Sequence, residues 1–279
     1  MTTDVEVLVV SYGSAAVIEG LLHSIESVAP GLPVAVREHA GIDHYRRLQA
    51  VVSSYRGPSR TEHDPGNPGF GAGCNALAAG STAAWYAFLN PDTELLTWPW
   101  RSADPPPATI VGPVMDADPA AHYGRRYRLR DEIRRSWLRS TDPAPEGTGF
   151  VSGAALLVDA DSFHRVGGFD PGYFMFYEDI DLCLRANDEG IATTIESAWT
   201  MHHARGHSTS ERFGDSLLWS YGSATRFHRA HGSSLPAYRA YVVADSALRA
   251  VVHTVRRDRR RRDAYAVLAR RAGRDLIGG

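Results

Sequence analysis

The segment of residues 5–13, "VEVLVVSYG", is the feature that most restricts the fold of this chain. It is a nearly continuous apolar run, rich in β-branched residues, and it ends at a glycine. Runs of this kind are typical of strands buried on both faces, which occur in parallel sheets covered by helices on both sides. Ser14 is placed to cap a helix directly after the strand. The apolar residues of that helix recur at helical spacing and are Val17, Leu21, Leu22, Ile25 and Val28.

Further strand signals alternate with helical ones along the chain. Strands are predicted at residues 33–38, just before Asn67, at residues 84–90 and at residues 149–159. This alternation predicts an α/β fold with a mostly parallel sheet flanked by helices. In such sheets ligands bind beyond the carboxyl ends of the strands, so the site is expected there.

Two segments differ in composition from this α/β pattern. Residues 102–147 contain the run "DPPP" and seven arginines, which indicates a variable surface insertion within a domain of residues 1–234. Residues 235–279 are predicted to form a basic helical extension. We expect one helix from Leu235 to Val255 that continues into a run of arginines. That run is Arg256, Arg257, Arg259, Arg260, Arg261 and Arg262.

The basic residues are 30 in number and all of them are arginines. The absence of lysine excludes a P-loop nucleotide site and a lysine Schiff base. Residues 249–279 carry ten arginines and three aspartates, a charge of +7 within a formal net charge of −2, so the first 248 residues carry −9. An acidic body with a basic tail predicts an anionic partner, either phosphate groups or a membrane surface.

Targeting signals are absent from the sequence as given. No apolar run reaches the length of about 20 residues that crosses a membrane, and the first strand starts without a signal peptide. We therefore expect a cytoplasmic protein, with a peripheral contact at the inner face of the membrane left open. The two cysteines, Cys74 and Cys183, are too few for a disulfide framework and are expected to be reduced and buried.

Two short motifs offer groups for ligand binding. Asn90, Pro91 and Asp92 follow a predicted strand, where a carboxylate can bind a hard divalent cation. A plain strand-ending turn explains the same residues. The glycines from Gly66 to Gly73 precede a helix and let the backbone approach a ligand closely, although their spacing does not match a dinucleotide motif.

The segment of residues 169–185, "FDPGYFMFYEDIDLCLR", crowds carboxylates against aromatic residues. Buried carboxylates need a cation, a proton or a ligand. On a helix Asp181 lies next to Arg185, at i and i+4, which leaves Glu178 and Asp179 at the helix start to face a cleft. Three histidines after the next strand favour a metal or phosphate contact. They are His202, His203 and His207.

These motifs in this order, "LNPD" at residues 89–92, then residues 169–185, then "HHARGHS" from His202, resemble the family 2 glycosyltransferases. The resemblance covers residues 5–210 and indicates the rhamnosyltransferase-like branch. It implies the GT-A fold, a Rossmann-like sheet for nucleotide-diphosphate sugars, and transfer with inversion at the anomeric carbon. The implied donor is dTDP-rhamnose or a related deoxysugar or furanose donor, and the implied cofactor is Mg²⁺ or Mn²⁺.

The resemblance also implies partners. The acceptor would carry a hydroxyl group on a lipid-linked glycan or a small natural product, in cell-wall or polysaccharide biosynthesis or in natural-product glycosylation. No nucleic acid is implied, and a homodimer is left open. The resemblance does not cover the basic extension of residues 235–279. From its composition, either this extension lies against an anionic leaflet or a diphosphate-linked lipid, or it packs on the body with a solvated arginine face. In the first case the arginines of the insertion would line the acceptor side of the cleft. These arginines are Arg125, Arg126, Arg128, Arg130, Arg134, Arg135 and Arg139.

Roles for individual residues follow from the same resemblance. Asp179, with Glu178 beside it, is expected to take the proton of the acceptor hydroxyl, while Asp92 and His203 hold the metal ion. The residues expected to bind the donor are Ser11, Tyr12, Glu38, Gly69, Phe70, Gly73, Asn75, Asn90 and Asp92. The residues expected on the acceptor side are Phe174, Tyr177 and Arg185.

Three positions depart from the family pattern. Gly13 replaces a frequent asparagine, Glu38 begins a pair that is usually Asp-Asn, and Asn90 replaces the first aspartate of the metal motif. These departures keep open a non-catalytic protein that binds sugar nucleotides or glycans. The combination of Asp179 with a metal pair favours an enzyme, because a binding protein has little need of a base. A nucleotidyltransferase would need a basic glycine-rich loop after the first strand, which "SYGSAAVIEG" does not supply.

Overall fold

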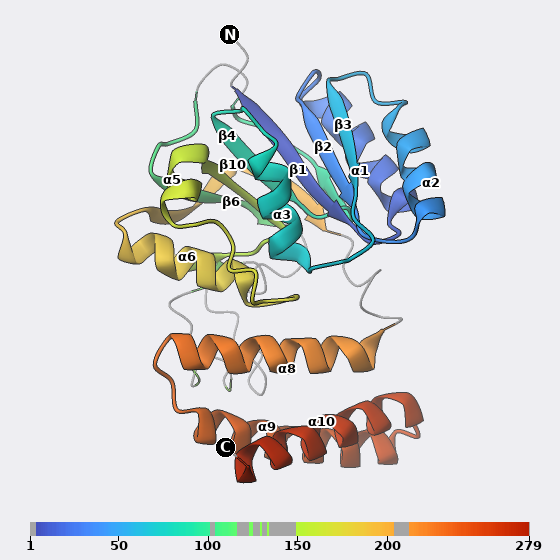
Figure 1. Ribbon diagram of the computed structural model, residues 1–279, viewed down its shortest axis with the longest axis vertical. Helices are drawn as coiled ribbons and strands as arrows, with labels where there is room; N and C mark the ends of the chain where they lie inside the picture. Colours follow the sequence, from blue (N-terminus) through green and yellow to red (C-terminus); the bar gives the residue numbers. More distant parts are fainter. Residues whose placement is uncertain are drawn as a thin grey trace.

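The structure of this chain is a computed structural model, and it describes residues 4–100, 104–115, 123–124, 129, 133, 149–203 and 212–278. Figure 1 shows an α/β body built on a twisted sheet and, below it, a layer of long helices. The helices of this lower layer are α8 (Phe213–Ala230), α9 (Leu235–Val255) and α10 (Arg259–Ile277).

The body contains one eight-stranded sheet among the described residues, as the α/β prediction requires. In spatial order its strands are β3 (Ser59–His63), β2 (Val34–Glu38), β1 (Val5–Ser11), β4 (Trp85–Leu89), β9 (Ala155–Asp159), β6 (Thr109–Met115), β10 (Ala192–His203) and β5 (Thr93–Leu95). The first four strands are parallel, whereas β9 runs antiparallel to β4 and β6. The carboxyl ends of β1 and β4 therefore lie side by side at one edge of the sheet.

β1 is buried on both faces, as its apolar run predicts. Val7, Leu8 and Val9 are fully buried. Val7 and Val9 belong to a core shared with α1 (Ala15–Val28) and α2 (Ile42–Val52). Leu8 belongs to a second core, which includes residues of the three helices α3 (Phe70–Ala79), α6 (Glu178–Asp188) and α8. The short helix α5 (Ala160–Arg165) follows β9.

Ser14 precedes α1, but its side chain does not cap the helix as predicted. Its backbone has φ −95° and ψ 19°, away from the extended geometry that aims a capping oxygen at the first free amides. Its hydroxyl instead donates to the carbonyl oxygen of Tyr12, at 3.4 Å. The backbone carbonyl of Ser14 starts the helix by accepting from the amides of Val17 and Ile18.

The single strand predicted for residues 149–159 is wrong, because the segment forms two strands. β8 (Phe150–Val151) pairs with β7 (Tyr123–Gly124), and β9 joins the main sheet. Between them the amide of Ala155 donates to the carbonyl of Ser152, and the amide of Gly153 donates to the carboxylate of Asp179. These bonds hold residues 152–154 in a turn.

The continuous helix predicted through the arginines after Val255 is also wrong. The chain turns at Arg257, which has φ +58°, and α10 starts after Asp258. The side chain of Asp258 accepts a hydrogen bond from the amide of Arg261 at 3.0 Å, which is a helix cap. The arginines therefore lie in a turn and in the first turn of α10, and α10 packs against α9.

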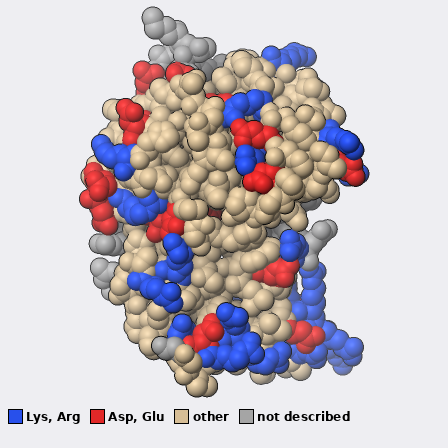
Figure 2. Space-filling view, viewed as in Figure 1, with Lys and Arg blue, Asp and Glu red and all other residues tan. Residues whose placement is uncertain are grey.

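Helix α8 contacts the α/β body and also α10 of its own helical layer. Its Ser223 donates to the carbonyl of Met175 in the body at 2.8 Å, and its Tyr221 donates to Asp275 of α10 at 3.0 Å. α8 lies before residue 235 in sequence, so the predicted division of the chain at that residue stays a prediction. Figure 2 shows arginines gathered at the lower edge of the helical layer.

Three further expectations concern single residues and segments. Cys74 and Cys183 are free and buried, as predicted. Among the described helices, none is long and apolar enough to cross a bilayer. The insertion arginines between Arg125 and Arg139 lie outside the described residues.

The carboxylate of Asp181 is the main ionic contact between α6 and the end of α8. It accepts from Arg185 at 2.8 Å, as the i, i+4 spacing predicts, and from His231 at 2.9 Å. Burial alone would raise the pKa of Asp181, but the hydrogen bond from His231 and the charge of Arg185 lower it below its usual value.

Asp181→Asn is expected to lower the free energy of unfolding by roughly 2–4 kcal/mol at pH 7, because it leaves Arg185 and His231 without their shared anion. A lowered folded pKa stabilises the protein above the unfolded pKa of about 3.9, and that contribution disappears as pH falls through the folded pKa. Urea unfolding should therefore show the variant and the parent converging below about pH 4. Asp188→Asn, an exposed change on the same helix, is the matched control; an equal loss in both variants would contradict the assignment.

Candidate active site

A cavity of about 680 Å³ opens beyond the carboxyl ends of β1 and β4. Its wall combines the loop after β1, the start of α3, residues 90–92 after β4, the loop before α6, and α8. This is the edge of the sheet where a parallel α/β fold is expected to bind ligands. The predicted site residues in the wall are Ser11, Tyr12, Gly69, Phe70, Asn90, Asp92, Phe174, Tyr177, Glu178, Asp179 and His203.

Four other predicted residues lie outside the cavity wall. Glu38 is fully buried, and its carboxylate accepts from the hydroxyl of Ser11 at 2.7 Å and from the amides of Gly13 and Ala40 at 2.8 and 2.7 Å. Because both oxygens bind the protein itself, Glu38 shapes the loop after β1 and is not placed to contact a donor base.

The remaining three also bind the protein. Asn75 forms two hydrogen bonds with the backbone of Phe169, and Arg185 donates to the carbonyls of Val166 and Gly168 as well as to Asp181. A Cβ atom at Gly73 would lie 2.6 Å from Nε2 of His39, so this glycine permits close packing of α3 on the sheet. The structure therefore gives these predicted ligand-binding residues packing and positioning contacts.

Gly69 sets the approach of the two loops that form the cavity. It has φ +103°, and a Cβ atom there would lie 2.3 Å from the carbonyl oxygen of Phe174. The next amide, of Phe70, donates to that same oxygen at 3.0 Å. Only glycine fits this close approach, so the glycine-rich segment joins α3 to the loop before α6.

Asp92 and His203 lie together in the wall, although they come from different strand ends. Oδ1 of Asp92 is 3.3 Å from Nε2 of His203, and each side chain is 12% exposed. Two ligand atoms at about 2.1 Å from one ion, and at a right angle to each other, are separated by about 3 Å. The spacing of the pair therefore fits two adjacent positions around Mn²⁺ or Mg²⁺. Carboxylate is the ligand type that suits these two ions, whereas imidazole suits softer divalent metals such as Zn²⁺ and Fe²⁺. Among the described residues no group of three or more acidic, histidine or cysteine side chains gathers for a metal.

The other two histidines of the motif differ from His203. His202 lies beside it on β10, in register with Glu94 of β5, and is not in the cavity wall. His207 lies outside the described residues.

Asp179 lies in the first turn of α6 with its carboxylate in the cavity wall. One oxygen accepts from the amide of Gly153 and the other from the amide of Ile180, both at 2.8 Å. The side chain is half-buried, so it can still reach a ligand. Two preceding residues, Phe176 and Tyr177, have φ values of +71° and +69°, and such strain in residues other than glycine is concentrated at functional sites.

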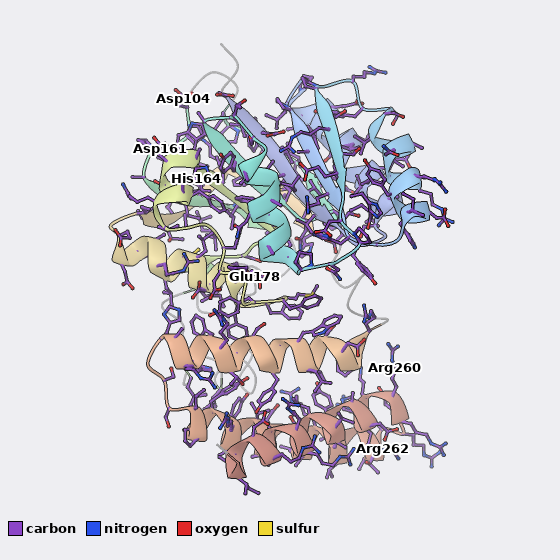
Figure 3. All side chains as sticks on the ribbon, in the orientation of Figure 1. Asp104, Asp161, His164, Glu178, Arg260 and Arg262 are labelled. Atoms are coloured by element: carbon purple, nitrogen blue, oxygen red, sulfur yellow. The ribbon has the colours of Figure 1, made fainter. Side chains whose placement is uncertain are left out.

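Glu178 differs from Asp179 although it is the adjacent residue. It is buried, and its Oε2 has no hydrogen-bond partner among the described residues. Burial, followed by the negative charge of Asp179, raises the pKa of Glu178 well above its usual range. Figure 3 places Glu178 at the start of α6, between the body and α8. Glu178 is buried, whereas the half-buried carboxylate of Asp179 is directed by two backbone amides, so the geometry favours Asp179 as the candidate base.

Helix α8 supplies a part of the cavity wall that was not predicted from the sequence. Trp219 packs on Phe174 with ring centroids 5.0 Å apart, and the guanidinium carbon of Arg212 lies 4.7 Å from the centre of the Trp219 ring. Arg212 is the one arginine among the described residues of the wall. No sequence motif identifies these residues as part of a site, because a tryptophan in a helical segment is normally interpreted as a core residue.

Comparison with proteins of known sequence gives relatives that transfer rhamnose. No family model matches the chain. N-acetylglucosaminyl-diphospho-decaprenol L-rhamnosyltransferase of Mycobacterium tuberculosis strain H37Rv is 28% identical over 247 residues, which cover 75% of this chain and 78% of the relative. Rhamnosyltransferase WbbL of Escherichia coli K12 is 38% identical over 78 residues, which cover 28% of this chain and 30% of the relative.

Comparison with solved structures confirms the predicted GT-A fold. GalNAc-T7 with UDP, GalNAc and Mn²⁺ matches with a TM-score of 0.58 and 12% identity, over 72% of this chain and 44% of that one. The mannosyltransferase PcManGT of Pyrobaculum calidifontis, with GDP-Man and Mn²⁺, matches with a TM-score of 0.54 and 16% identity, over 96% and 87% of the two chains. At such identities the likeness concerns the fold alone.

Glu178→Gln is expected to weaken the pH dependence of stability. Because the folded pKa of Glu178 lies above the unfolded one, the folded protein holds a proton that the unfolded chain releases, and the free energy of unfolding falls as pH rises above about 4.3. The variant lacks this loss, so its stability should decline less than that of the parent between about pH 5 and pH 8. Urea unfolding at several pH values measures the slopes, with the exposed change Glu189→Gln as control. Parallel slopes for parent and Glu178→Gln would contradict the raised pKa.

Proposed function

We infer that this chain, a rhamnosyltransferase-like member of the family 2 glycosyltransferases, transfers a deoxysugar from a nucleotide-diphosphate donor to a hydroxyl acceptor with inversion at the anomeric carbon. Rhamnose, as dTDP-rhamnose, is the first candidate for the sugar. The observation that carries the proposal is the presence of Asp179 and the Asp92–His203 pair in the wall of one cavity. Inversion needs a base for the acceptor and a stabilised leaving group for the donor, and these two sets of residues supply both.

Asp179 is proposed as the general base. Its two amide contacts fix the direction of the carboxylate, and the half-buried position lets an acceptor hydroxyl approach it. The raised pKa of Glu178 favours its neutral form, which adds no second negative charge beside Asp179. Phe174 and Tyr177 make this side of the cavity partly apolar, which favours proton transfer to a carboxylate over its hydration.

Asp92 and His203 are proposed to hold a divalent ion at the donor diphosphate. The ion's charge would offset the negative charge that develops on the leaving group as the glycosidic bond breaks. Phosphate oxygens of the donor and water would complete the coordination, as is usual for Mg²⁺ at phosphate sites. Asn90 lies in the same wall and can donate or accept a hydrogen bond there.

The acceptor is proposed to be a diphosphate-linked lipid glycan. The M. tuberculosis relative is named for such an acceptor, N-acetylglucosaminyl-diphospho-decaprenol. Arg212 supports this acceptor class, because it is a cation in the cavity wall and guanidinium groups bind phosphate well. A small natural product remains the alternative acceptor, and it would not require this cation.

Asp179→Asn is expected to keep donor affinity and to lose roughly 100-fold or more in kcat, because a base acts on the transition state more than on ground-state binding. Donor binding by calorimetry and turnover with a sugar-acceptor panel measure the two effects. Asp188→Asn, exposed on the same helix, should behave as the parent. A raised KM with unchanged kcat would show that Asp179 binds substrate and is not the base.

Asp92→Ala is expected to abolish the thermal stabilisation that the donor gives in the presence of Mn²⁺ or Mg²⁺, while the protein without donor keeps its unfolding temperature. His203→Ala should weaken the same effect, since it removes the second ligand. Thermal unfolding with dTDP-rhamnose, with each metal and with chelator, gives the comparison. Normal turnover of Asp92→Ala, together with no effect of chelator on the parent, would rule out the metal assignment.

A further inference from the structure

Helix α9 is apolar on its exposed side as well as at the buried residues Tyr238 and Val242, which is unusual for a helix at the surface of a protein. A surface helix normally exposes charged residues and buries apolar ones. The exposed side of α9 carries no charged residue along its whole length. We call this side the α9 apolar face; its residues are Ala237, Ala240, Ala244, Ala247, Leu248, Val251, Val252 and Val255.

The large apolar side chains of this face are exposed in its carboxyl-terminal half. The exposed fractions are 44% for Leu248, 61% for Val251, 37% for Val252 and 80% for Val255. The spacing of these residues places them along one stripe of the helix. Single exposed apolar residues are ordinary, whereas a continuous stripe indicates a binding surface.

The charged residues of α9 lie on its other side. Arg239 donates to the backbone carbonyl of Asp275 in α10, and Arg249 pairs with Asp245 at 2.7 Å while its guanidinium lies over the ring of Tyr265. Polar groups therefore contribute to the packing between α9 and α10, and the apolar side is left outward. The outward side is apolar although the helix also contains charged residues.

A dense group of arginines adjoins the carboxyl end of the apolar face. Residues 256–262 contain six arginines and a single aspartate, Asp258. Arg256, Arg257 and Arg260 are exposed, and Figure 3 shows Arg260 and Arg262 at one end of the helical layer. Four of the arginines start α10, where the amino-terminal helix dipole adds further positive potential.

We propose that the α9 apolar face and the adjoining arginines dock on a bilayer that contains anionic lipids, with α9 lying in the plane of the interface. Apolar side chains beside clustered arginines match the two properties of such a surface, an acyl boundary and negative headgroups. A second copy of this chain could cover the apolar side chains, but it would not neutralise the arginines, because it would bring six more arginines to the interface. The charge of residues 256–262 therefore selects the membrane as the occupant.

The docking surface is continuous with the cavity. The guanidinium carbon of Arg261 lies 5.5 Å from the centre of the Phe213 ring at the start of α8, and that ring packs on Tyr265 of α10. The preceding residue, Arg212, is in the cavity wall. Docking would thus bring the α8 end of the cavity toward the headgroups, where a lipid-linked acceptor presents its sugar. This second step rests on the proposed function, whereas the docking itself does not.

The test is flotation of the full chain with phosphatidylcholine vesicles, prepared with and without phosphatidylglycerol. The parent should float with the anionic vesicles, and its bound fraction should fall as salt screens the arginines over about 8 Å at physiological ionic strength. Val251→Glu combined with Val255→Glu should lower vesicle binding about 10-fold or more, because it places charge in the apolar stripe. Arg259→Gln combined with Arg260→Gln should lower it roughly 10-fold and weaken the salt dependence, which the four remaining arginines of residues 256–262 still support.

Matched controls lie on α2, far from this surface in sequence. Ile42 is 49% exposed, and Arg46 and Arg47 are exposed, so Ile42→Glu and the pair Arg46→Gln with Arg47→Gln make equivalent changes there and should bind vesicles as the parent does. The proposal would be overturned if the parent and Val251→Glu/Val255→Glu floated with the anionic vesicles to the same extent. The proposal would also be overturned if the parent did not bind vesicles and was a dimer by light scattering, while Val251→Glu/Val255→Glu was a monomer. That result would assign the α9 apolar face to a dimer interface.

Failure of docking and failure of the proposed function give different results. Donor-dependent thermal stabilisation, measured without vesicles, reports the cavity alone and should be the same in Val251→Glu/Val255→Glu and in the parent. Loss of vesicle binding with intact donor stabilisation supports the docking surface. Normal vesicle binding by a parent that no nucleotide sugar stabilises would retain the docking surface and reject the sugar-transfer proposal.

Discussion

The cavity exists because the loop of residues 169–177 lies against the start of α3. The amide of Phe70 and the bare Cα of Gly69 meet the carbonyl of Phe174, and Asn75 binds both the amide and the carbonyl of Phe169. These contacts join the start of α3 to the segment that leads into Asp179. A side chain at residue 69 would separate the two loops, so the wall of the cavity depends on this close approach.

Three carboxyl groups near the start of α6 lie in different environments and differ in charge and contacts. Asp181 is ionised between Arg185 and His231 and anchors the end of α8. Burial raises the pKa of Glu178 and favours its neutral form, while Asp179 accepts from two backbone amides. One residue holds the helical layer, one is a neutral neighbour and one presents a directed carboxylate. Burial and local hydrogen bonds produce these differences, since the three side chains carry the same functional group.

Much of the fold is encoded in local patterns of the sequence. The apolar run of β1, the strand before residues 90–92 and the helix that starts at Glu178 were all predictable, because periodicity and turn residues act over a few positions. Asp92, His203 and Asp179 were predictable through a resemblance of ordered motifs. Asp92 and His203 meet in one wall because β4 and β10 run in the same direction: β9 is antiparallel to both β4 and β6, and β10 is parallel to β6. Asp179 is held at this wall by the hydrogen bond from the amide of Gly153.

Local sequence patterns indicate which carboxylates, histidines and glycines are available and on which elements they lie. Packing between distant segments decided that Glu38 accepts from the amide of Gly13, that Asn75 binds the backbone of Phe169, and that α8 closes the cavity with Trp219. It also decided that α9 turns its charged side toward α10 and leaves Val255 outward. The physical reason is that a helix pattern fixes which residues share a face, whereas the partner of that face depends on packing between distant segments.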